Sequence, residues 1–250
     1  MLSKEREQEI MNILKSTGGF VTVRQLCSAL FASESSIRRD LKSLEEKGLI
    51  KRSYGGASLR RSLSNIVTFN HRTRQNVNQK LDIAKKAAAL IKDGDIVFLD
   101  QSSTAFYLAT ELMNKRSLTV VTNNIEILML LSDSSVNVVS SGGFLSGENR
   151  NCLIGGNAQN TFEGIFADIM FFSVKALDDN GIISDCSSEE ISVRNSMLKN
   201  ARKKVLLCDS SKFGERASFK QGELSDVDCF ISEGAEAKRF ARFEGKIELL

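Results

Sequence analysis

The chain has 250 residues, 42% of them hydrophobic and 26% charged, which is enough for one large domain and a small one and excludes a disordered chain. No apolar run approaches the roughly 20 residues that cross a bilayer, and the N-terminus begins with charged residues, so we expect a cytoplasmic protein without membrane contact. Although the formal net charge is only +3, residues 1–74 carry 14 Lys and Arg against 7 Asp and Glu, which favours contact with nucleic acid at this end.

Three short helices are expected within the first 50 residues. Ser3 is a candidate N-cap for the first helix, which the glycines at 18–19 end. Thr22 and Gln25 have the spacing of a capping box at the start of the second helix, and Ser33 is the candidate cap of the third. Three helices this short and this close together are typical of a helix-turn-helix, so we expect a small DNA-binding domain.

The third of these helices has one apolar and one polar side. Ile37, Leu41 and Leu44 fall within about 60° of one another on a helical wheel and form the side expected to be buried. The opposite side presents hydroxyl groups and cations that can contact base edges and phosphates in a major groove. The candidate DNA contacts on this helix are Ser35, Ser36, Arg38, Arg39 and Lys42.

A basic turn follows the third helix. Lys51, Arg52, Tyr54 and Gly55 lie in a segment whose paired glycines, Gly55 and Gly56, predict a hairpin. A hairpin wing beside a recognition helix can touch the DNA backbone or the minor groove. Lys51, Arg52, Tyr54 and Gly55 are therefore also candidate DNA contacts. A charged helix face by itself is more often only solvated, and the adjoining wing is what favours DNA binding here.

After the expected wing, the composition of the chain changes. From Ser58 to about Asn65 the sequence is polar and basic without periodicity, as in a linker. A helix is predicted from about Asn78 to Ile91. The sequence therefore divides into a winged helix-turn-helix domain over residues 1–57, a linker over 58–75 and a second domain over 76–250.

Short apolar runs alternate with helical segments throughout the second domain. This alternation predicts an α/β domain with a largely parallel sheet that is covered on both faces. The expected strands are Ile96–Leu99, Leu118–Thr122, Val136–Ser140, Ile169–Val174, Val205–Cys208, Cys229–Ser232 and Ile247–Leu250.

Polar and glycine-rich clusters follow several of these strands. In parallel sheets, ligands bind where the carboxyl ends of strands meet the N-termini of helices, and backbone N–H groups there attract anions. Each cluster alone is ordinary loop chemistry, but their joint placement predicts a site for a phosphorylated small molecule. The candidate contacts are Asp100, Ser102, Ser103, Thr104, Thr122, Asn123, Gly142, Gly143 and Lys212.

The N-terminal motifs resemble the DNA-binding signature of the DeoR family. The resemblance is carried without gaps by the segments Ser36–Leu41, Leu44–Arg52 and Gly55–Ala57. It implies a transcription regulator, most often a repressor, that binds double-stranded operator DNA. Because one small head binds an operator only weakly, we expect a homo-oligomer, a dimer or a tetramer.

The polar clusters of the second domain resemble the sensor half of the same family. That half looks like the ribose-phosphate isomerase fold and is used to sense sugar phosphates and related metabolites, which implies an effector but no cofactor. The sequence departs from the family pattern at Ser102, Gly156 and Arg194, where relatives usually have glycine, proline and lysine. A side chain at Ser102 is expected either to crowd a phosphate or to contact it through its hydroxyl.

Two other functions remain open from the sequence. A regulator that has lost its ligand would explain the departure at Ser102. An isomerase-like enzyme would need an acid or a base, for which Asp100, Glu190 and Lys212 are the only evident candidates. The five cysteines are scattered singly and the chain has one histidine, so we expect reduced thiols and no metal site. We favour the effector-controlled repressor and expect no enzymatic activity.

Overall fold

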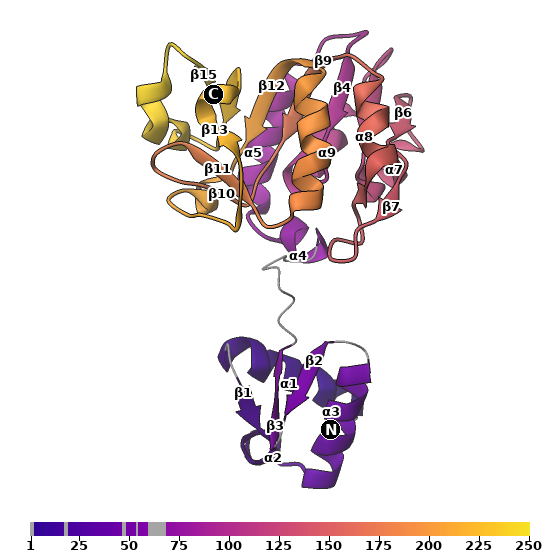
Figure 1. Ribbon diagram of the computed structural model, residues 1–250, viewed down its shortest axis with the longest axis vertical. Helices are drawn as coiled ribbons and strands as arrows, with labels where there is room; N and C mark the ends of the chain where they lie inside the picture. Colours follow the sequence, from indigo (N-terminus) through magenta and orange to yellow (C-terminus); the bar gives the residue numbers. More distant parts are fainter. Residues whose placement is uncertain (1–2, 18–19, 47–48, 54, 60–68) are drawn as a thin grey trace. The chain divides into compact units, whose positions relative to one another are not determined.

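The computed structural model of the chain describes residues 3–17, 20–46, 49–53, 55–59 and 69–250 (Figure 1). It divides into two compact units, Met1–Asn65 and Ile66–Leu250. We call the first unit the head and the second unit the sensor.

The head is a winged helix-turn-helix. Its elements are α1 (Ser3–Thr17), β1 (Phe20–Thr22), α2 (Val23–Leu30), α3 (Glu34–Glu46), β2 (Ile50–Ser53) and β3 (Gly56–Leu59). The strands form an antiparallel sheet in the order β1-β3-β2, so the expected wing is confirmed as the β2–β3 hairpin. The three-residue strand β1 was not predicted, because it is too short to show an alternating pattern. Ile10, Leu14, Leu26 and Ile37 are fully buried and hold the three helices together.

The N-caps of α2 and α3 follow the expected chemistry, whereas Ser3, the expected cap of the first helix, is the first residue within α1. The Thr22 hydroxyl accepts a hydrogen bond from the Gln25 N–H, and the Gln25 side chain accepts one from the Thr22 N–H at 2.8 Å, which confirms the capping box. The Ser33 hydroxyl accepts from the Ser36 N–H at 3.3 Å. The expected end of the first helix at residues 18–19 lies outside the described residues.

The sensor is built on a seven-stranded parallel sheet. The strand order is β15-β14-β12-β9-β4-β5-β6, and every expected strand is found within a few residues of its predicted bounds. The strands are β4 (Ile96–Leu99), β5 (Thr119–Thr122), β6 (Asn137–Ser140), β9 (Ala167–Phe172), β12 (Ala201–Leu207), β14 (Cys229–Ile231) and β15 (Glu248–Leu249).

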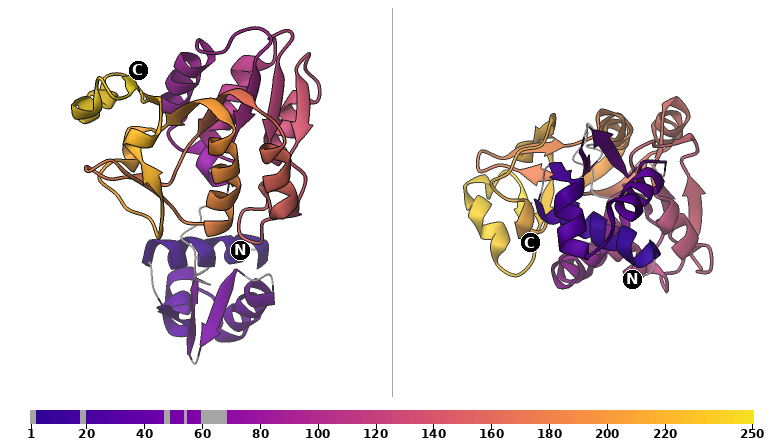
Figure 2. Two further views of the ribbon diagram at one scale, coloured as in Figure 1. Left: turned by 45° about the horizontal axis from the view of Figure 1, so that its top comes forward. Right: turned by 90° about the horizontal axis from the view of Figure 1, so that it is seen from below.

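Helices cover both faces of this sheet, as the alternation predicts. They are α4 (Phe69–Arg74), α5 (Val77–Ala88), α6 (Ser103–Leu112), α7 (Ile125–Leu131), α8 (Gly156–Glu163) and α9 (Ser188–Lys199). In Figure 1, α8 and α9 lie in front of the sheet and α5 lies behind it, and Figure 2 shows these layers from another direction. Phe98 packs into the core under α8 and α9, whereas its neighbours Val97 and Leu99 pack into the core under α5 and α6.

Some of the sensor was not predicted. A small antiparallel sheet joins β10 (Ala176–Leu177), β11 (Ile182–Asp185) and β13 (Phe219–Glu223), and a hairpin joins β7 (Phe144–Leu145) and β8 (Leu153–Ile154). Within the range of the expected linker, 58–75, β3 runs to Leu59 and α4 begins at Phe69. Three 3-10 segments complete the fold: Ser210–Lys212, Leu224–Asp226 and Glu236–Phe243.

All five cysteines are free thiols, and all but Cys27 are buried. Among the helices of the described residues, none has both the length and the apolar composition needed to span a bilayer.

Candidate DNA-binding surface and ligand site

Helix α3 presents the expected cationic surface. Arg38, Arg39 and Lys42 are exposed, opposite the buried Ile37 and Leu41. The Arg38 guanidinium donates to the Glu34 carboxylate one turn earlier, with Nε 2.8 Å from Oε1. Arg39 has no ion pair or hydrogen bond through its side chain within the described residues. Arg39 is therefore the cation on this helix that is freest to bind DNA.

The other candidate contacts on α3 have weaker internal partners. Lys42 Nζ lies 3.9 Å from the Glu46 carboxylate, and both side chains are exposed. The hydroxyls of Ser35 and Ser36 lie 3.1 and 2.9 Å from the Ser33 hydroxyl, at the start of the helix. Ser35 and Ser36 lie in the first turn of α3, and Lys42 lies in its C-terminal half.

Of the four predicted DNA contacts in the wing, the structure describes Arg52 and Gly55 in full. The Arg52 side chain is exposed, with Nε 3.7 Å from the Glu45 carboxylate. Gly55 has φ +81°, which favours glycine, and its carbonyl accepts from the Val23 N–H at 2.8 Å. The Lys51 side chain and the whole of Tyr54 lie outside what the structure describes.

A buried ion pair holds α3 in position. Asp40 is 2% exposed and accepts from the Arg6 guanidinium of α1. The hydrogen bond to Asp40 raises the pKa of Arg6. This pair fixes the recognition helix against α1, so the exposed cations are presented from a rigid element.

In the sensor, the carboxyl ends of β4, β5, β9 and β12 bring polar residues to one edge of the sheet. Asp100, after β4, is fully buried. Its Oδ1 accepts from the Ser102 N–H at 3.0 Å, and its Oδ2 accepts from the Ser173 N–H at 3.2 Å and Arg194 Nε at 3.3 Å. Sequence reasoning made Asp100 a ligand contact, whereas its carboxylate is occupied inside the protein.

Arg194 is the largest fully buried side chain, and its charge is balanced locally. Besides Asp100, its guanidinium lies 3.1 Å from the Asp185 carboxylate and donates to Gln221 Oε1 at 2.9 Å. Although burial opposes its charge, Asp185 and Asp100 raise the pKa of Arg194. This residue ties the ends of the main sheet to the small sheet, and it does not supply a free cation.

Ser102 is the N-cap of α6. Its hydroxyl accepts from the Ala105 N–H at 3.0 Å, and its φ of −75° is ordinary for a serine. The hydroxyl is therefore used by the helix, and the serine does not strain the backbone. Ser103 is buried at the first position of the same helix.

Three further predicted contacts lie at the carboxyl ends of β5 and β6. The buried Thr122 hydroxyl donates to the Leu99 carbonyl at 2.7 Å. Gly142 and Gly143 are exposed and have φ of +64° and +105°. A Cβ on Gly143 would lie 2.4 Å from the Ile154 carbonyl oxygen, so this glycine is required by close backbone packing.

Lys212 is one of several cations near this edge of the sheet. Lys212 Nζ donates to the Ser173 hydroxyl at 2.7 Å and lies 3.5 Å from the Asp209 carboxylate. Lys80, from α5, is 3% exposed, and its amine donates to the backbone carbonyls of Arg72 and Gln75. The pKa of Lys80 is lowered to about 8, chiefly by burial and also by the positive charges of Lys212 and Arg72, while the charge of Asp209 opposes this shift. We call Arg72, Lys80 and Lys212 the cationic cluster.

Arg72 completes this cluster with unused donors. Its Nε and Nη2 are buried and have no acceptor among the described residues. Its charge acts on both Lys80 and the buried carboxylate of Glu190. A guanidinium with two buried, unsatisfied N–H groups is suited to bind an anion.

Buried oxygens near the same strand ends also lack partners. Glu190, at the start of α9, accepts from Gln101 Nε2 at 2.8 Å and from Asn149 Nδ2 at 3.0 Å. The oxygens of both amides are left without a donor within the described residues. The buried side-chain oxygens without a hydrogen-bond donor among the described residues are Gln101 Oε1, Thr104 Oγ1, Asn123 Oδ1, Asn149 Oδ1 and Asp209 Oδ2. Of these, Asp209 Oδ2 forms an ion pair with Lys212.

Sequence reasoning missed Arg72, Lys80, Gln101 and Asn149. Gln101 stands inside the predicted cluster, so its position was a usable signal. Arg72 and Lys80 lie before the first strand of the main sheet, and no local pattern separates them from surface cations.

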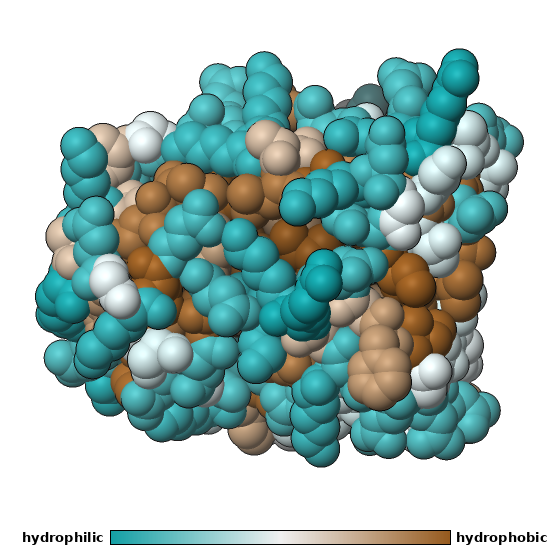
Figure 3. All heavy atoms as spheres, turned by 90° about the horizontal axis from the view of Figure 1, so that it is seen from above, coloured by the Kyte–Doolittle hydropathy of each residue, from teal (hydrophilic) through white to brown (hydrophobic). Residues whose placement is uncertain are grey.

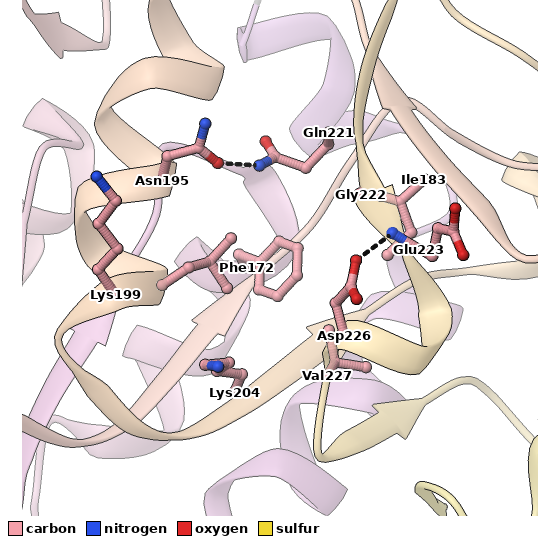
Figure 4. A pocket seen from close by; sticks show the side chains of 11 residues that line it. Phe172, Ile183, Asn195, Lys199, Lys204, Gln221, Gly222, Glu223, Asp226 and Val227 are labelled. Atoms are coloured by element: carbon pink, nitrogen blue, oxygen red, sulfur yellow. Dashed lines mark hydrogen bonds between the residues drawn. The ribbon is translucent and has the colours of Figure 1, made fainter.

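A separate pocket of about 340 Å³ lies between α9 and β13 (Figure 4). Its lining combines apolar side chains such as Phe172 and Leu198 with polar ones such as Asn195 and Gln221. Gln221 donates to Asn195 at 2.6 Å, as Figure 4 shows. The lining includes none of the predicted ligand contacts, so this pocket is distinct from the cluster at the strand ends.

The family models that match the chain cover both units. A DeoR-like helix-turn-helix domain matches residues 6–62, and a DeoR C terminal sensor domain matches residues 75–234. The chain belongs to the DeoR family of transcriptional regulators.

Curated relatives match along nearly the whole chain. The transcriptional regulator GolR of Listeria innocua is 34% identical over 93% of this chain and 91% of its own length. The lactose phosphotransferase system repressor of Lactococcus lactis is 32% identical over 93% and 92% of the two chains. The glycerol-3-phosphate regulon repressor of Haemophilus influenzae is 32% identical over 91% and 88%.

Among solved structures, ribose 5-phosphate isomerase A of Methanocaldococcus jannaschii is 21% identical, with a TM-score of 0.42, over 56% of this chain and 55% of that one.

Proposed function

We propose that this DeoR-family chain is a repressor whose operator binding is controlled by a phosphorylated small molecule. The observation that carries the proposal is the cationic cluster of Arg72, Lys80 and Lys212 at the carboxyl ends of the sensor sheet. Arg72 has unused buried donors, and Lys80 carries a charge that its surroundings disfavour. Binding of a dianion would relieve both conditions.

Hydrogen bonds join the cationic cluster to the N-terminus of α6, and this arrangement suits a phosphate. Lys212 donates to the Ser173 hydroxyl, the Ser173 N–H donates to Asp100, and Asp100 accepts from the N–H of Ser102 at the start of α6. Lysine and arginine supply full charge, and a helix N-terminus supplies partial positive charge. In this scheme Asp100 positions the donors and does not touch the ligand.

The names of two relatives support the same class of effector. One is named for the glycerol-3-phosphate regulon and another for the lactose phosphotransferase system, and both are called repressors. The buried unsatisfied groups also favour a ligand over the ligand-independent alternative, because such groups are costly to leave without partners.

Operator binding requires at least two copies of the head in this proposal. A single recognition helix and wing read too few base pairs for specific binding, and paired heads match paired half-sites. Figure 3 shows one face of the molecule with hydrophobic surface between hydrophilic side chains. Met129, Phe144 and Phe166 are large apolar side chains of the sensor that are exposed.

The test compares Lys212→Met with the parent protein. Calorimetry with inorganic phosphate and with a panel of sugar phosphates should show binding at least about ten-fold weaker in the variant, because a charge-assisted hydrogen bond is lost. Operator affinity without ligand should stay unchanged, and unphosphorylated sugars should bind poorly to both proteins.

The matched control is Lys204→Met, a half-buried lysine of β12 outside the cluster. This variant should bind phosphate compounds like the parent. If Lys212→Met responds like the parent, or if the tightest ligand carries no anionic group, the phosphate site is wrong.

A further inference from the structure

Phe31 occupies the turn between α2 and α3 in the head. Its side chain is 97% exposed, whereas Leu30 and Ala32 on either side of it are partly buried and pack against the core of the head. None of the aromatic pairs and cation–π contacts among the described residues includes its ring. The ring therefore contributes almost no packing to the head itself.

The backbone of Phe31 has a conformation that favours glycine. Its φ of +49° and ψ of +42° lie in the left-handed region, and its N–H donates to the Cys27 carbonyl as the C-cap of α2. Glycine is the common residue at such a cap, because a Cβ is disfavoured there. A single exposed apolar side chain is ordinary on a protein surface. In Phe31 the exposure coincides with backbone strain, which is concentrated at functional sites.

The position of Phe31 indicates what its ring contacts. Phe31 precedes Ser33, the cap of α3, by two residues, so their Cα atoms lie within about 7 Å of each other. Helix-turn-helix domains contact base edges with the N-terminal residues of the recognition helix, where α3 carries Ser35 and Ser36. A phenyl ring makes no hydrogen bond to a base edge. The apolar group that the major groove offers to it is the C5-methyl of thymine.

We infer that Phe31 is a specificity-determining residue, whose ring packs against the C5-methyl group of a thymine in the major groove beside the N-terminus of α3. The inference goes beyond the proposed effector-controlled function, because it concerns which base the head reads. It also adds a preference that the arginines of α3 do not provide, since arginine favours guanine.

The first measurement removes only the methyl group. The full-length protein selects a DNA duplex from a random pool, and each thymine of that duplex is then replaced in turn by uracil, which lacks the C5-methyl. Fluorescence anisotropy at fixed salt should show binding about four-fold weaker at one position or more, because the burial of one methyl group is lost. We call the affinity for the thymine duplex divided by that for the uracil duplex the methyl ratio.

The second measurement removes the ring. Phe31→Gly should keep the fold, which circular dichroism checks, because glycine adopts the left-handed conformation freely. Its affinity for the thymine duplex should fall about ten-fold and its methyl ratio should fall to about one. Phe31→Leu retains an apolar side chain and should retain a methyl ratio of about two or more.

Two other variants are the controls. Phe166→Ala removes an exposed ring from the sensor and should leave the methyl ratio unchanged. Arg39→Ala should weaken both duplexes and lower the salt dependence of binding, whereas Phe31→Gly should leave the salt dependence as in the parent, because a ring releases no counterion.

The outcomes separate this inference from DNA binding itself. If the full-length protein selects no duplex, both fail. If no uracil replacement weakens binding of the parent, or if Phe31→Gly folds and keeps the full methyl ratio, Phe31 does not read thymine although the head binds DNA. Weaker self-association of Phe31→Gly in sedimentation, with the methyl ratio unchanged, would assign the ring to a contact between copies and overturn the inference.

Discussion

The head and the sensor place their functional side chains in opposite environments. In the head, the candidate DNA contacts Arg38, Arg39 and Arg52 are exposed on a small scaffold. In the sensor, Lys80, Gln101 and Glu190 are buried. Gln101 donates to Glu190, and the charges of Lys212 and Arg72 act on Lys80. A long polymer is contacted from the surface, whereas a small molecule has to be enclosed.

This difference changes what a substitution does. An exposed cation of the head contributes to binding and little to stability, because surface ion pairs are weak. A buried ionic group of the sensor contributes to both, because removal of one partner leaves the other charge uncompensated.

The largest effect should follow from Arg194→Leu. The substitution leaves Asp100 and Asp185 without their shared cation, so the sensor should lose about 3–5 kcal/mol of its free energy of unfolding. Urea denaturation measures the loss, and hydrogen exchange should place it in the sensor and not in the head. Arg202→Leu is the control: its guanidinium is 76% exposed and pairs with Asp168, so its effect should be within about 0.5 kcal/mol. Equal losses in the two variants would contradict the contrast between buried and exposed charges.

Arg39→Ala should affect operator binding and not stability. The variant should lose about 1–3 kcal/mol of operator binding if Arg39 reads a base, with sensor stability unchanged. Fluorescence anisotropy at fixed salt measures the affinity. Arg38→Ala should also weaken binding, but less, because Arg38 already bonds to Glu34. Full operator affinity in both variants would exclude α3 as the reading helix.

The cationic cluster should make ligand affinity depend on pH. Lys80 has a pKa of about 8 in the folded chain against 10.5 as its usual value, so the unfolded chain binds more protons here between these pH values, and the contribution of Lys80 to stability rises with pH. A phosphate dianion favours the charged amine, so its affinity should fall by up to about ten-fold between pH 7.5 and 9.5. Calorimetry over this range checks the slope, which Lys80→Met should flatten. Lys212, Arg72 and Asp209 face the same amine, and a slope that persists in Lys80→Met would assign it to one of them.

The smallest effect should come from Glu34→Gln. The change removes a carboxylate from the DNA-binding surface and frees Arg38 for DNA, so operator affinity should rise by a few-fold, equivalent to about 0.5–1 kcal/mol. The gain should shrink at high salt because exposed charges are screened. Weaker binding at low salt would show that Glu34 presents Arg38 to DNA in a useful position.

Local signals predicted the head more fully than the sensor site. The capping box of Thr22 and Gln25 and the turn at the wing glycines depend only on residues a few positions apart. Both could therefore be predicted from the sequence. The seven strands of the main sheet were also found, because each is a continuous apolar run. β10 and β7 have only two residues each, which is too short for any periodic signal.

The sensor site depends on contacts that the sequence does not display. Asp100 is predicted to contact the ligand because it follows a strand, and in the structure its carboxylate also accepts a hydrogen bond from Arg194, 94 residues later. Lys80 resembled a surface lysine until the fold buried it against α4. Such roles are set by tertiary packing, whereas the position of Lys212 after a strand was sufficient to predict a cation at this edge.

Hydrogen bonds hold the carboxyl end of helix α4 to its neighbours. The Lys80 amine binds the carbonyls of Arg72 and Gln75, and the Tyr107 hydroxyl donates to the Thr73 carbonyl at 2.8 Å. This helix carries Arg72 and is the first described element of the sensor. A ligand that binds Arg72 would therefore hold α4 through a side chain as well as through the backbone carbonyls that Lys80 and Tyr107 already contact. Because binding to the folded state alone stabilises it, such a ligand would slow the local opening of this helix.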